Sequence, residues 1–428
     1  MNISVGPRGM LTLALGAMMA VTLAVDDIPA QEAPDFLFDP TWPKPLPNNW
    51  KIGGITGLAV DADDNVWVLN RPNDLTALEL RVEPSPPIAL CCARPPSMIH
   101  FDRNGNVIGS FDAPQGHGMD VDNEGFVYIG QDTVRKYDPD TGQVVAEVAR
   151  TPEREGGARV GLPPPTARQP GQGGRGPVIN FITPRPAPDP AVAARRQAAV
   201  AAFREQYPPE TPMVVGGIEE IRIVDEDNEM YVADNYLGGR ILVFDLDTLQ
   251  FKRGWGAYGK PLAEISIDDA DHEYTPNGPM PPDFVGHLTV NVSHDGLVYA
   301  ADRNGNRIHV TTTEGEFLRE FVLAPETGAG GSTGGVAFSH DPEQRYLYIS
   351  DLTNNRIWFL NREDGTLVGE MGTMADNGGQ FFGLHMIAVD SDGNIYTGEV
   401  FTGQRVQRFV PEDSERGELL TQLAEMQY

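Results

Sequence analysis

The chain has 428 residues and a formal net charge of −29, from 61 acidic and 32 basic residues. This charge would repel the phosphates of a nucleic acid, so we exclude a nucleic-acid partner. Glycine (47 residues) and proline (36 residues) are frequent, which favours many short strands joined by tight turns.

Residues 1–30 have the pattern of a secretory signal peptide. Arg8 precedes an apolar run from Met10 to Val25, and we expect cleavage after Ala30. The run is short for a membrane span, although an uncleaved anchor is the alternative. No other segment approaches the about 20 apolar residues that a spanning helix needs. We therefore expect a secreted or periplasmic mature chain, residues 31–428, without a membrane span.

A strand, a polar turn and a second strand recur six times in the remaining sequence. The copies begin near residues 55, 116, 216, 285, 333 and 382, as in GHGMDVDNEGFVYIGQD (116–132). A third strand with Arg-Ile or Arg-Val usually follows, and often a fourth. Four strands at a period of about 40 residues are typical of a propeller blade, so the sequence predicts an all-β, six-bladed β-propeller.

Two segments compete for the strand that closes the ring. They are DFLFDPTWPKPLP (35–47) and the tail GELLTQLAEMQY (417–428). Closure removes the sheet edges that would otherwise aggregate, so one of them should pair with the last blade. The sequence leaves this choice open.

Three insertions interrupt the repeat, at residues 73–96, 150–214 and 257–284. Each follows the second or the fourth strand of a blade, and in a propeller the loops at these positions emerge on one face. The second insertion predicts a helix from Pro190 to Tyr207 with Asp189 as its N-cap. Long loops gathered on one face usually build a site, and this face could also bind a protein partner.

Cys91 and Cys92, the two cysteines of the chain, lie side by side in the first insertion. In an oxidising compartment neighbouring cysteines can form a vicinal disulfide. Two unlinked thiols are the alternative.

Three histidines share one position of the repeat. Counting back 14 residues from the end of the second strand reaches His117 and His385, and His287 lies one residue further because its turn is longer. Equivalent residues on alternate blades of a six-bladed ring lie about 120° apart around the tunnel. The sequence therefore predicts a metal site of three histidines with an open position, as in catalytic zinc sites. Iron, copper and manganese are alternatives, as are three polar residues hydrogen-bonded to water.

Other polar residues are expected at the same end of the tunnel. The same count reaches Glu220, which could contact the metal or a substrate amine, or be solvated. Arg71, Tyr236 and Arg303 follow second strands, where they could bind a carboxylate and transfer a proton, or simply be surface residues. A further set recurs at one repeat position and predicts structural ion pairs, namely Arg240 with Asp234, Arg307 with Asp302 and Arg356 with Asp351.

The repeat resembles the NHL family of propellers, and the histidine motifs resemble a narrower group, the peptidyl-α-hydroxyglycine α-amidating lyases. His117 in GHGMDVD, His287 in GHLTVNVSHDG and His385 in LHMIAVD match the three histidine motifs of that group. The resemblance implies a catalytic Zn²⁺ held by these histidines. It also implies that Tyr236 is the catalytic tyrosine and that Arg303 and Arg71 are active-site arginines.

The implied reaction cleaves the C–N bond of a carbinolamide to an amide and glyoxylate. Its substrate would be a peptide or small molecule bearing a carboxylate, and a related hydroxylated substrate is an alternative. Met386 stands where the family has an aspartate that helps to bind a structural calcium ion, which argues against Ca²⁺ here.

Two other functions remain open. One is a metal-dependent lactonase or esterase like the gluconolactonase propellers, although those use Glu, Asn and Asp around calcium where this tunnel has histidines. The other is a binding scaffold that holds a partner on the face of the insertions.

Overall fold

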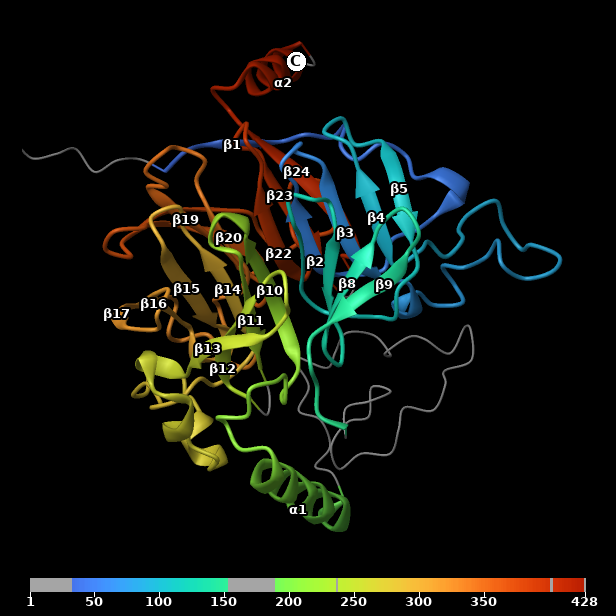
Figure 1. The fold of residues 1–428 in the computed structure, drawn as a ribbon. Coiled ribbons are helices and arrows are strands. Elements are labelled where there is room, and N and C mark those ends of the chain that lie inside the picture. The colour runs from blue at the N-terminus through green and yellow to red at the C-terminus, as the bar shows by residue number, and fades with distance from the viewer. Residues whose placement is uncertain (1–32, 153–188, 236–237, 401–402, 427–428) are drawn as a thin grey trace, which may run out of the picture. The chain divides into compact units, whose positions relative to one another are not determined.

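Six four-stranded antiparallel sheets form the blades of a β-propeller, which confirms the predicted fold (Figure 1). The structure, a computed structural model, describes residues 33–152, 189–235, 238–400 and 403–426. The signal peptide expected over residues 1–30 lies outside these residues. Neither of the two α-helices in the described part has the length and apolar character that a membrane span requires.

The strands follow one another from the inside of each blade to the outside. Blades one to three contain β2 (Gly54–Val60), β3 (Val66–Arg71), β4 (Met98–Phe101) and β5 (Val107–Phe111), then β6 (Met119–Val121), β7 (Val127–Gly130), β8 (Val134–Asp138) and β9 (Gln143–Glu147), then β10 (Ile218–Val224), β11 (Glu229–Asp234), β12 (Arg240–Asp245) and β13 (Phe251–Trp255). Blades four and five contain β14 (Leu288–Val292), β15 (Leu297–Asp302), β16 (Arg307–Thr312) and β17 (Phe317–Val322), then β18 (Val336–Phe338), β19 (Tyr346–Asp351), β20 (Arg356–Asn361) and β21 (Leu367–Met371).

The N-terminal segment closes the ring. Blade six contains β22 (Leu384–Val389), β23 (Ile395–Glu399) and β24 (Val406–Pro411), and its outer strand is β1 (Phe36–Phe38), antiparallel to β24. The competing tail instead forms helix α2 (Glu415–Glu425), capped by Ser414. Asp39 joins the two ends, because its carboxylate accepts hydrogen bonds from Arg408 at 2.6 Å and from Arg416 at 2.7 Å.

The core consists of six apolar clusters, one between each pair of neighbouring blades. Between blades six and one, for example, Met386 and Tyr396 pack against Ile55 and Trp42. Each blade thus buries both of its faces, which explains why its strands read as near-continuous apolar runs. The blades therefore hold the starts of the innermost strands in fixed positions around the tunnel.

The three insertions lie between the strands that the sequence repeat predicted. The first lies between β3 and β4, the second between β9 and β10, and the third between β13 and β14. Helix α1 (Pro190–Gln206) confirms the predicted helix, and the Asp189 carboxylate accepts a hydrogen bond from Ala191 N at 2.8 Å. The sulfur atoms of Cys91 and Cys92 lie next to each other. The two residues are neighbours in the chain, so the closeness of their sulfur atoms does not by itself show a bond, and the disulfide stays a prediction.

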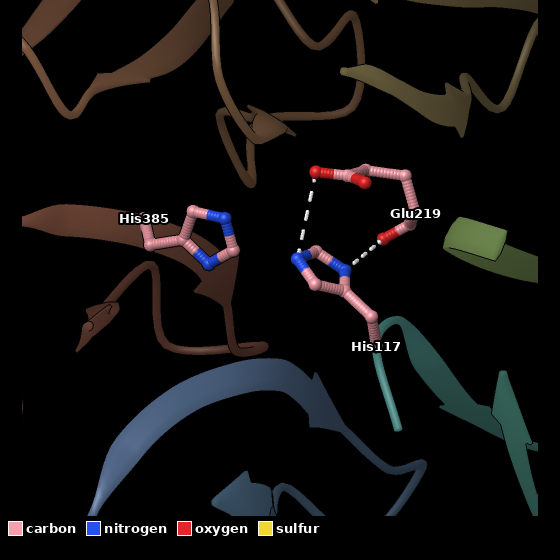
Figure 2. A group of neighbouring side chains, drawn as sticks. All are labelled: His117, Glu219 and His385. Carbon is pink, nitrogen blue, oxygen red and sulfur yellow. Dashed lines mark hydrogen bonds and ion pairs between the residues drawn. The ribbon is translucent and has the colours of Figure 1, made fainter. Parts of the chain in front are cut away.

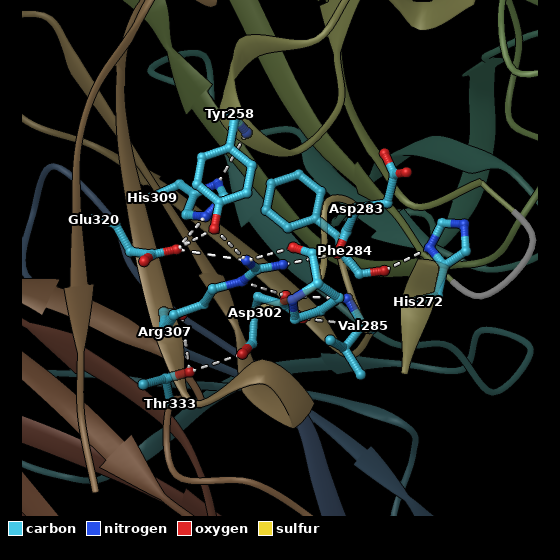
Figure 3. Close-up of polar contacts among 12 residues, drawn as sticks. Tyr258, His272, Asp283, Phe284, Val285, Asp302, Arg307, His309, Glu320 and Thr333 are labelled. Atoms are coloured by element: carbon cyan, nitrogen blue, oxygen red, sulfur yellow. Dashed lines mark hydrogen bonds and ion pairs between the residues drawn. The ribbon is translucent and has the colours of Figure 1, made fainter. Parts of the chain in front are cut away.

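A buried arginine fastens the third insertion to blade four (Figure 3). Arg307 donates to the Asp302 carboxylate at 2.9 Å, the Tyr258 hydroxyl at 2.8 Å and the Asp283 carbonyl at 2.7 Å. The insertion contains the short helices η6 (Ala257–Gly259), η7 (Leu262–Glu264) and η8 (Asp269–His272). Arg307 therefore ties this face of blade four to the loop above it.

Two of the three predicted ion pairs are present. Arg240 pairs with Asp234 at 2.9 Å, and Arg307 pairs with Asp302 at 2.9 Å. The third prediction is wrong, because Arg356 pairs with Glu370 at 2.6 Å. Asp351, the expected partner, instead accepts hydrogen bonds from the side chains of Trp358 and Asn354.

Candidate metal centre

Side chains at the starts of the innermost strands bond to the next blade around the tunnel. Thr56 donates to the carbonyl of Gly116 at 2.9 Å, and Thr289 donates to the carbonyl of Gly334 at 2.6 Å. Such bonds satisfy strand-edge carbonyls that have no partner within their own sheet. They also fix the direction in which the side chains at this level point.

Two of the predicted histidines make the same kind of bond. His117 Nδ1 lies 2.7 Å from the Glu219 carbonyl oxygen, and His385 Nδ1 lies 3.1 Å from the Ile55 carbonyl oxygen. A carbonyl can only accept, so Nδ1 carries the proton in each neutral ring and Nε2 keeps its lone pair. A hydrogen bond from the second ring nitrogen to an oxygen is the usual support of a metal-binding histidine.

Local irregularities turn the key side chains toward one another. The ladder of β10 with β11 shifts register between Ile218 and Glu220, and that of β22 with β23 shifts between Leu384 and Met386. The residue left unpaired by each shift is Glu219 in the first case and His385 in the second. Such β-bulges redirect one side chain out of the normal alternation and are frequent beside active sites.

His117, Glu219 and His385 form one cluster (Figure 2). Their ligand atoms all lie within 4.8 Å of one another, and Figure 2 shows nitrogens of both rings and a carboxylate oxygen facing the same space. His117 Nε2 lies 3.5 Å from Glu219 Oε1. Ligand atoms around a tetrahedral zinc ion, with bonds of about 2.0–2.1 Å, lie about 3.3 Å apart. The cluster therefore has donor types that zinc binds, and its His117–Glu219 pair is close to the spacing of a zinc site.

His287, the third predicted histidine, contacts this cluster through Glu219. Its Nδ1 lies 2.9 Å from Glu219 Oε1, and its backbone N–H donates to Asn235 Oδ1 at 2.9 Å. The Asn235 amide also reaches Glu219 Oε2 at 3.4 Å. The Glu219 carboxylate thus lies between His117 and His287, so all three histidines gather at one end of the tunnel.

Glu219 was missed by the sequence analysis, which placed Glu220 at the histidine level. Counting back 14 residues from the end of the second strand gave the wrong residue because the hairpin of blade three is one residue longer. Its first strand pair joins Ile218 to Asp234, whereas the equivalent pair in blade six joins Leu384 to Glu399.

A different alignment would have found Glu219. Ile221 and Ile223 alternate in the same way as Ile387 and Val389 of blade six. When these apolar residues are aligned, instead of the acid that ends the second strand, Glu219 occupies the position equivalent to His385 of blade six.

The charges of the cluster suit a metal ion. Burial lowers the pKa of His117 to about 4, although the negative charge of Glu219 acts to raise it. Burial also lowers the pKa of His385 well below its ordinary value, aided by the charges of His117 and Arg303. Burial alone would raise the pKa of Glu219, but its interactions with His117 and His287, including the His287 hydrogen bond, and the charge of Arg303 hold it well below its ordinary range. Neutral imidazoles and an ionised carboxylate are the states that bind metals.

The two predicted arginines lie beside this cluster. Arg71 ends β3 and Arg303 follows β15, and Arg303 is 5% exposed. Arg303 N donates to the His287 carbonyl at 3.4 Å, and Arg71 pairs with Gly54, the residue before Ile55, whose carbonyl contacts His385. Both arginines therefore start from backbone close to the histidines. Tyr236, the predicted catalytic tyrosine, lies outside the described residues.

Glu220 is buried beside Arg222, with 3.8 Å between its Oε2 and the nearest guanidinium nitrogen. Burial raises its pKa to about 7. It is not a member of the cluster that the ligand atoms of Glu219 and the histidines form.

Comparison with known proteins does not assign a family. No protein-family model and no curated protein matches the chain. The chain aligns with a crystal structure of a structural genomics protein of unknown function from Bacteroides thetaiotaomicron VPI-5482. That alignment has a TM-score of 0.48 and 12% sequence identity, and it covers 89% of this chain and 72% of that chain. The function must therefore be argued from the site.

Proposed function

We propose that this protein is an exported, zinc-dependent lyase that cleaves the C–N bond of a carbinolamide. The products would be an amide and glyoxylate. One observation carries the proposal: His117, Glu219 and His385 form a cluster of potential metal ligands. Arg303 and Arg71, whose backbones lie close to His287 and to the strand that contacts His385, would bind a carboxylate there. The motif resemblance to the amidating lyases agrees with it.

The residues that would hold zinc are His117 and His385, completed by His287, by Glu219 or by both. The Nδ1 hydrogen bonds of His117 and His385 leave Nε2 as the donor on each ring. When bound, zinc would supply a Lewis acid that polarises the substrate hydroxyl and makes its proton more acidic. Glu219, which contacts His287 at 2.9 Å, would orient that ring even where it is not itself a ligand.

The arginines would bind and orient the substrate. A guanidinium group binds a carboxylate through two parallel hydrogen bonds, which fixes the position and the direction of the acid. With its carboxylate held by Arg71 and Arg303, an N-acyl-α-hydroxyglycine would direct its hydroxyl-bearing carbon toward the histidines. Such positioning converts binding energy into rate.

The reaction would move one proton from the substrate hydroxyl to its nitrogen, with Tyr236, ionised beside the arginines, as the carrier that accepts it and then gives it up. Tyr236 would accept the hydroxyl proton, and the electron pair of that O–H bond would become the C=O bond of glyoxylate. The C–N bond would break, and the nitrogen would take a proton and leave as the amide. Atoms and charges balance without an oxidant or a second substrate.

Metal content and product release test the proposal. The purified protein should contain about one zinc per chain and release glyoxylate from an N-acyl-α-hydroxyglycine. The double variant His117→Ala/His385→Ala should lose both properties. His340→Ala, which changes an exposed histidine on a turn of blade five, is the matched control and should keep them. A folded protein without bound zinc would contradict the proposal, and zinc without glyoxylate release would contradict the lyase reaction.

A second candidate is a binding scaffold, which the three insertions on one face favour. A scaffold needs neither the histidines nor a metal. Binding of a protein partner that survives in the His117→Ala/His385→Ala variant would support it.

A further inference from the structure

A cavity of about 400 Å³ lies between the first insertion and the connection from blade one to blade two. This volume is within the about 300–1,000 Å³ of typical small-molecule pockets. Its walls include Trp50, Pro72, Arg94, Pro95, Pro96 and Gln115.

Hydrogen bonds to blade one and to the segment just before it hold the cavity walls in place. Lys51 N donates to the Ala93 carbonyl at 3.0 Å, and Ala93 N donates to the Asn49 carbonyl at 2.8 Å. The Asn70 amide donates to the Pro96 carbonyl at 2.8 Å. Because both ends of the wall are fastened, a ligand would not have to order it on binding, which favours affinity.

Two residues of the cavity wall are close in the chain to the candidate metal centre. Pro72 lines the cavity, and its chain neighbour Arg71 pairs with Gly54, which precedes Ile55, whose carbonyl lies 3.1 Å from His385 Nδ1. On the other side, Gln115 lines the cavity two residues before His117. Neighbouring Cα atoms are about 3.8 Å apart, so these wall residues lie within about 8 Å of the site residues along the chain. A substrate held at Arg71 can therefore extend into the cavity.

The lining has a polar part and an apolar part. The polar part includes Asn73, Ser97 and Asp112, and the Asp112 carboxylate accepts a hydrogen bond from Ser97 N at 3.3 Å. The Trp50 indole and the rings of Pro72, Pro95 and Pro96 offer flat apolar surfaces, which suit an aromatic or proline ring. The Arg94 guanidinium already donates to Asn73 Oδ1 at 3.2 Å and lies 3.7 Å from the Glu83 carboxylate, so its charge is met within the protein.

We propose that this cavity binds the acyl part of the substrate and selects a ring-bearing apolar group, while the carboxylate lies at the arginines. That the other end of the ligand is a reacting hydroxyglycine rests on the proposed function. That the cavity near Arg71 binds a ring does not depend on that function.

Binding of unreactive analogues tests the proposal by calorimetry. N-benzoylglycine and N-acetylglycine carry the same carboxylate and no hydroxyl to react, and they differ in the ring alone. Burial of the ring should make N-benzoylglycine bind at least about tenfold more tightly than N-acetylglycine. Trp50→Ala, and Gln115→Trp, which fills the cavity from its other side, should bring the ratio close to one. Leu90→Ala, at an exposed position of the same insertion, should leave the ratio unchanged.

Benzamide, which has the ring but no carboxylate, separates the cavity from the reaction. Its binding to the wild-type protein but not to Trp50→Ala would support the cavity even if no glyoxylate were ever released. Equal affinity for the two acylglycines, an unchanged ratio in both cavity variants, or no measurable binding of N-benzoylglycine and benzamide would overturn the proposal.

Discussion

Glu219 connects the parts of the candidate metal centre. Its backbone carbonyl orients His117, and one carboxylate oxygen lies 3.5 Å from His117 and 2.9 Å from His287. It is 2% exposed, so its charge interacts with these rings through little water. A single residue thus sets the orientation of two histidines from different blades.

Glu219→Gln should weaken zinc binding while preserving the shape of the site. The amide loses the negative charge that faces the metal position and the His287 ring, so we expect the zinc affinity to fall about 10–100-fold. Competition with a chromophoric chelator measures this affinity. Glu220→Gln, in the buried neighbour outside the cluster, is the matched control and should change it little. An unchanged affinity in Glu219→Gln, with loss in His117→Ala, would exclude Glu219 from the centre.

At the residue scale, counting along the sequence placed side chains at the same level where the repeat was regular. The positions of His117 and His385 followed from counting, since their hairpins have the length of the repeat. Glu219 did not, because the β10–β11 hairpin has one additional residue that a fixed count ignores. The tautomer of each ring was also beyond the sequence, because the carbonyls that set it belong to the next blade.

At the scale of elements, equivalent arginines in the repeat have different roles. Arg307 is fully buried and fastens the third insertion, whereas Arg356 occupies the same repeat position and makes an ion pair whose side chains are 29% and 48% exposed. The difference arises from what lies above each blade. A long insertion covers blade four and supplies carbonyl and hydroxyl acceptors that the short loop of blade five lacks.

Arg307→Met should destabilise the protein far more than Arg356→Met. Removing the buried guanidinium leaves the Asp302 carboxylate buried without its cation, which typically costs about 3–5 kcal/mol of unfolding free energy. The exposed pair of Arg356 typically contributes about 0–1 kcal/mol. Urea unfolding measures both values, and faster proteolysis within residues 257–284 should accompany the first change. Equal losses of unfolding free energy in the two variants would show that the buried ion pair of Arg307 contributes no more than the pair of Arg356.

A helix could be predicted from signals within its own segment, but the strand that closes the ring could not, because two segments competed for that position. The α1 boundaries followed from Asp189 and the proline after it, which are local signals. The choice between β1 and the C-terminal tail depended on contacts between chain ends. Asp39, held by Arg408 and Arg416, provides those contacts, and no pattern within either segment reveals them.

At the scale of the whole molecule, buried carboxylates join the two chain ends, as Asp39 does, or the inner and outer strands of one blade, as Glu229 does. Burial alone would raise the pKa of Asp39, but hydrogen bonds from Arg416 and Arg408 hold it well below its ordinary range. Burial likewise acts to raise the pKa of Glu229, yet hydrogen bonds from Arg253, Lys252 and Tyr231 lower it to about 2. Both acids are nearly inaccessible to solvent, so their charges matter to folding.

These shifts predict a loss of stability in acid. A carboxylate whose pKa is depressed in the folded state binds fewer protons folded than unfolded, so its contribution is complete above its unfolded pKa. For Glu229 that ordinary value is 4.5, and the contribution should disappear as the pH falls from 4.5 toward about 2. The urea midpoint should therefore decrease across this interval. Glu229→Gln should lower the midpoint near neutral pH and flatten its fall with acid, because the titrating group is gone.

Glu226→Gln is the matched control for this change. Glu226 lies three residues before Glu229 and is exposed, so its replacement should leave both the midpoint and its pH dependence nearly unchanged. Other depressed carboxylates, among them Asp39, remain in both variants, so the slope should be reduced in Glu229→Gln and not abolished. A slope that is identical in the wild type and in Glu229→Gln would mean that Glu229 titrates alike in the folded and unfolded chains. The ion pairs of Glu229 with Arg253 and Lys252 would then not stabilise the fold in solution.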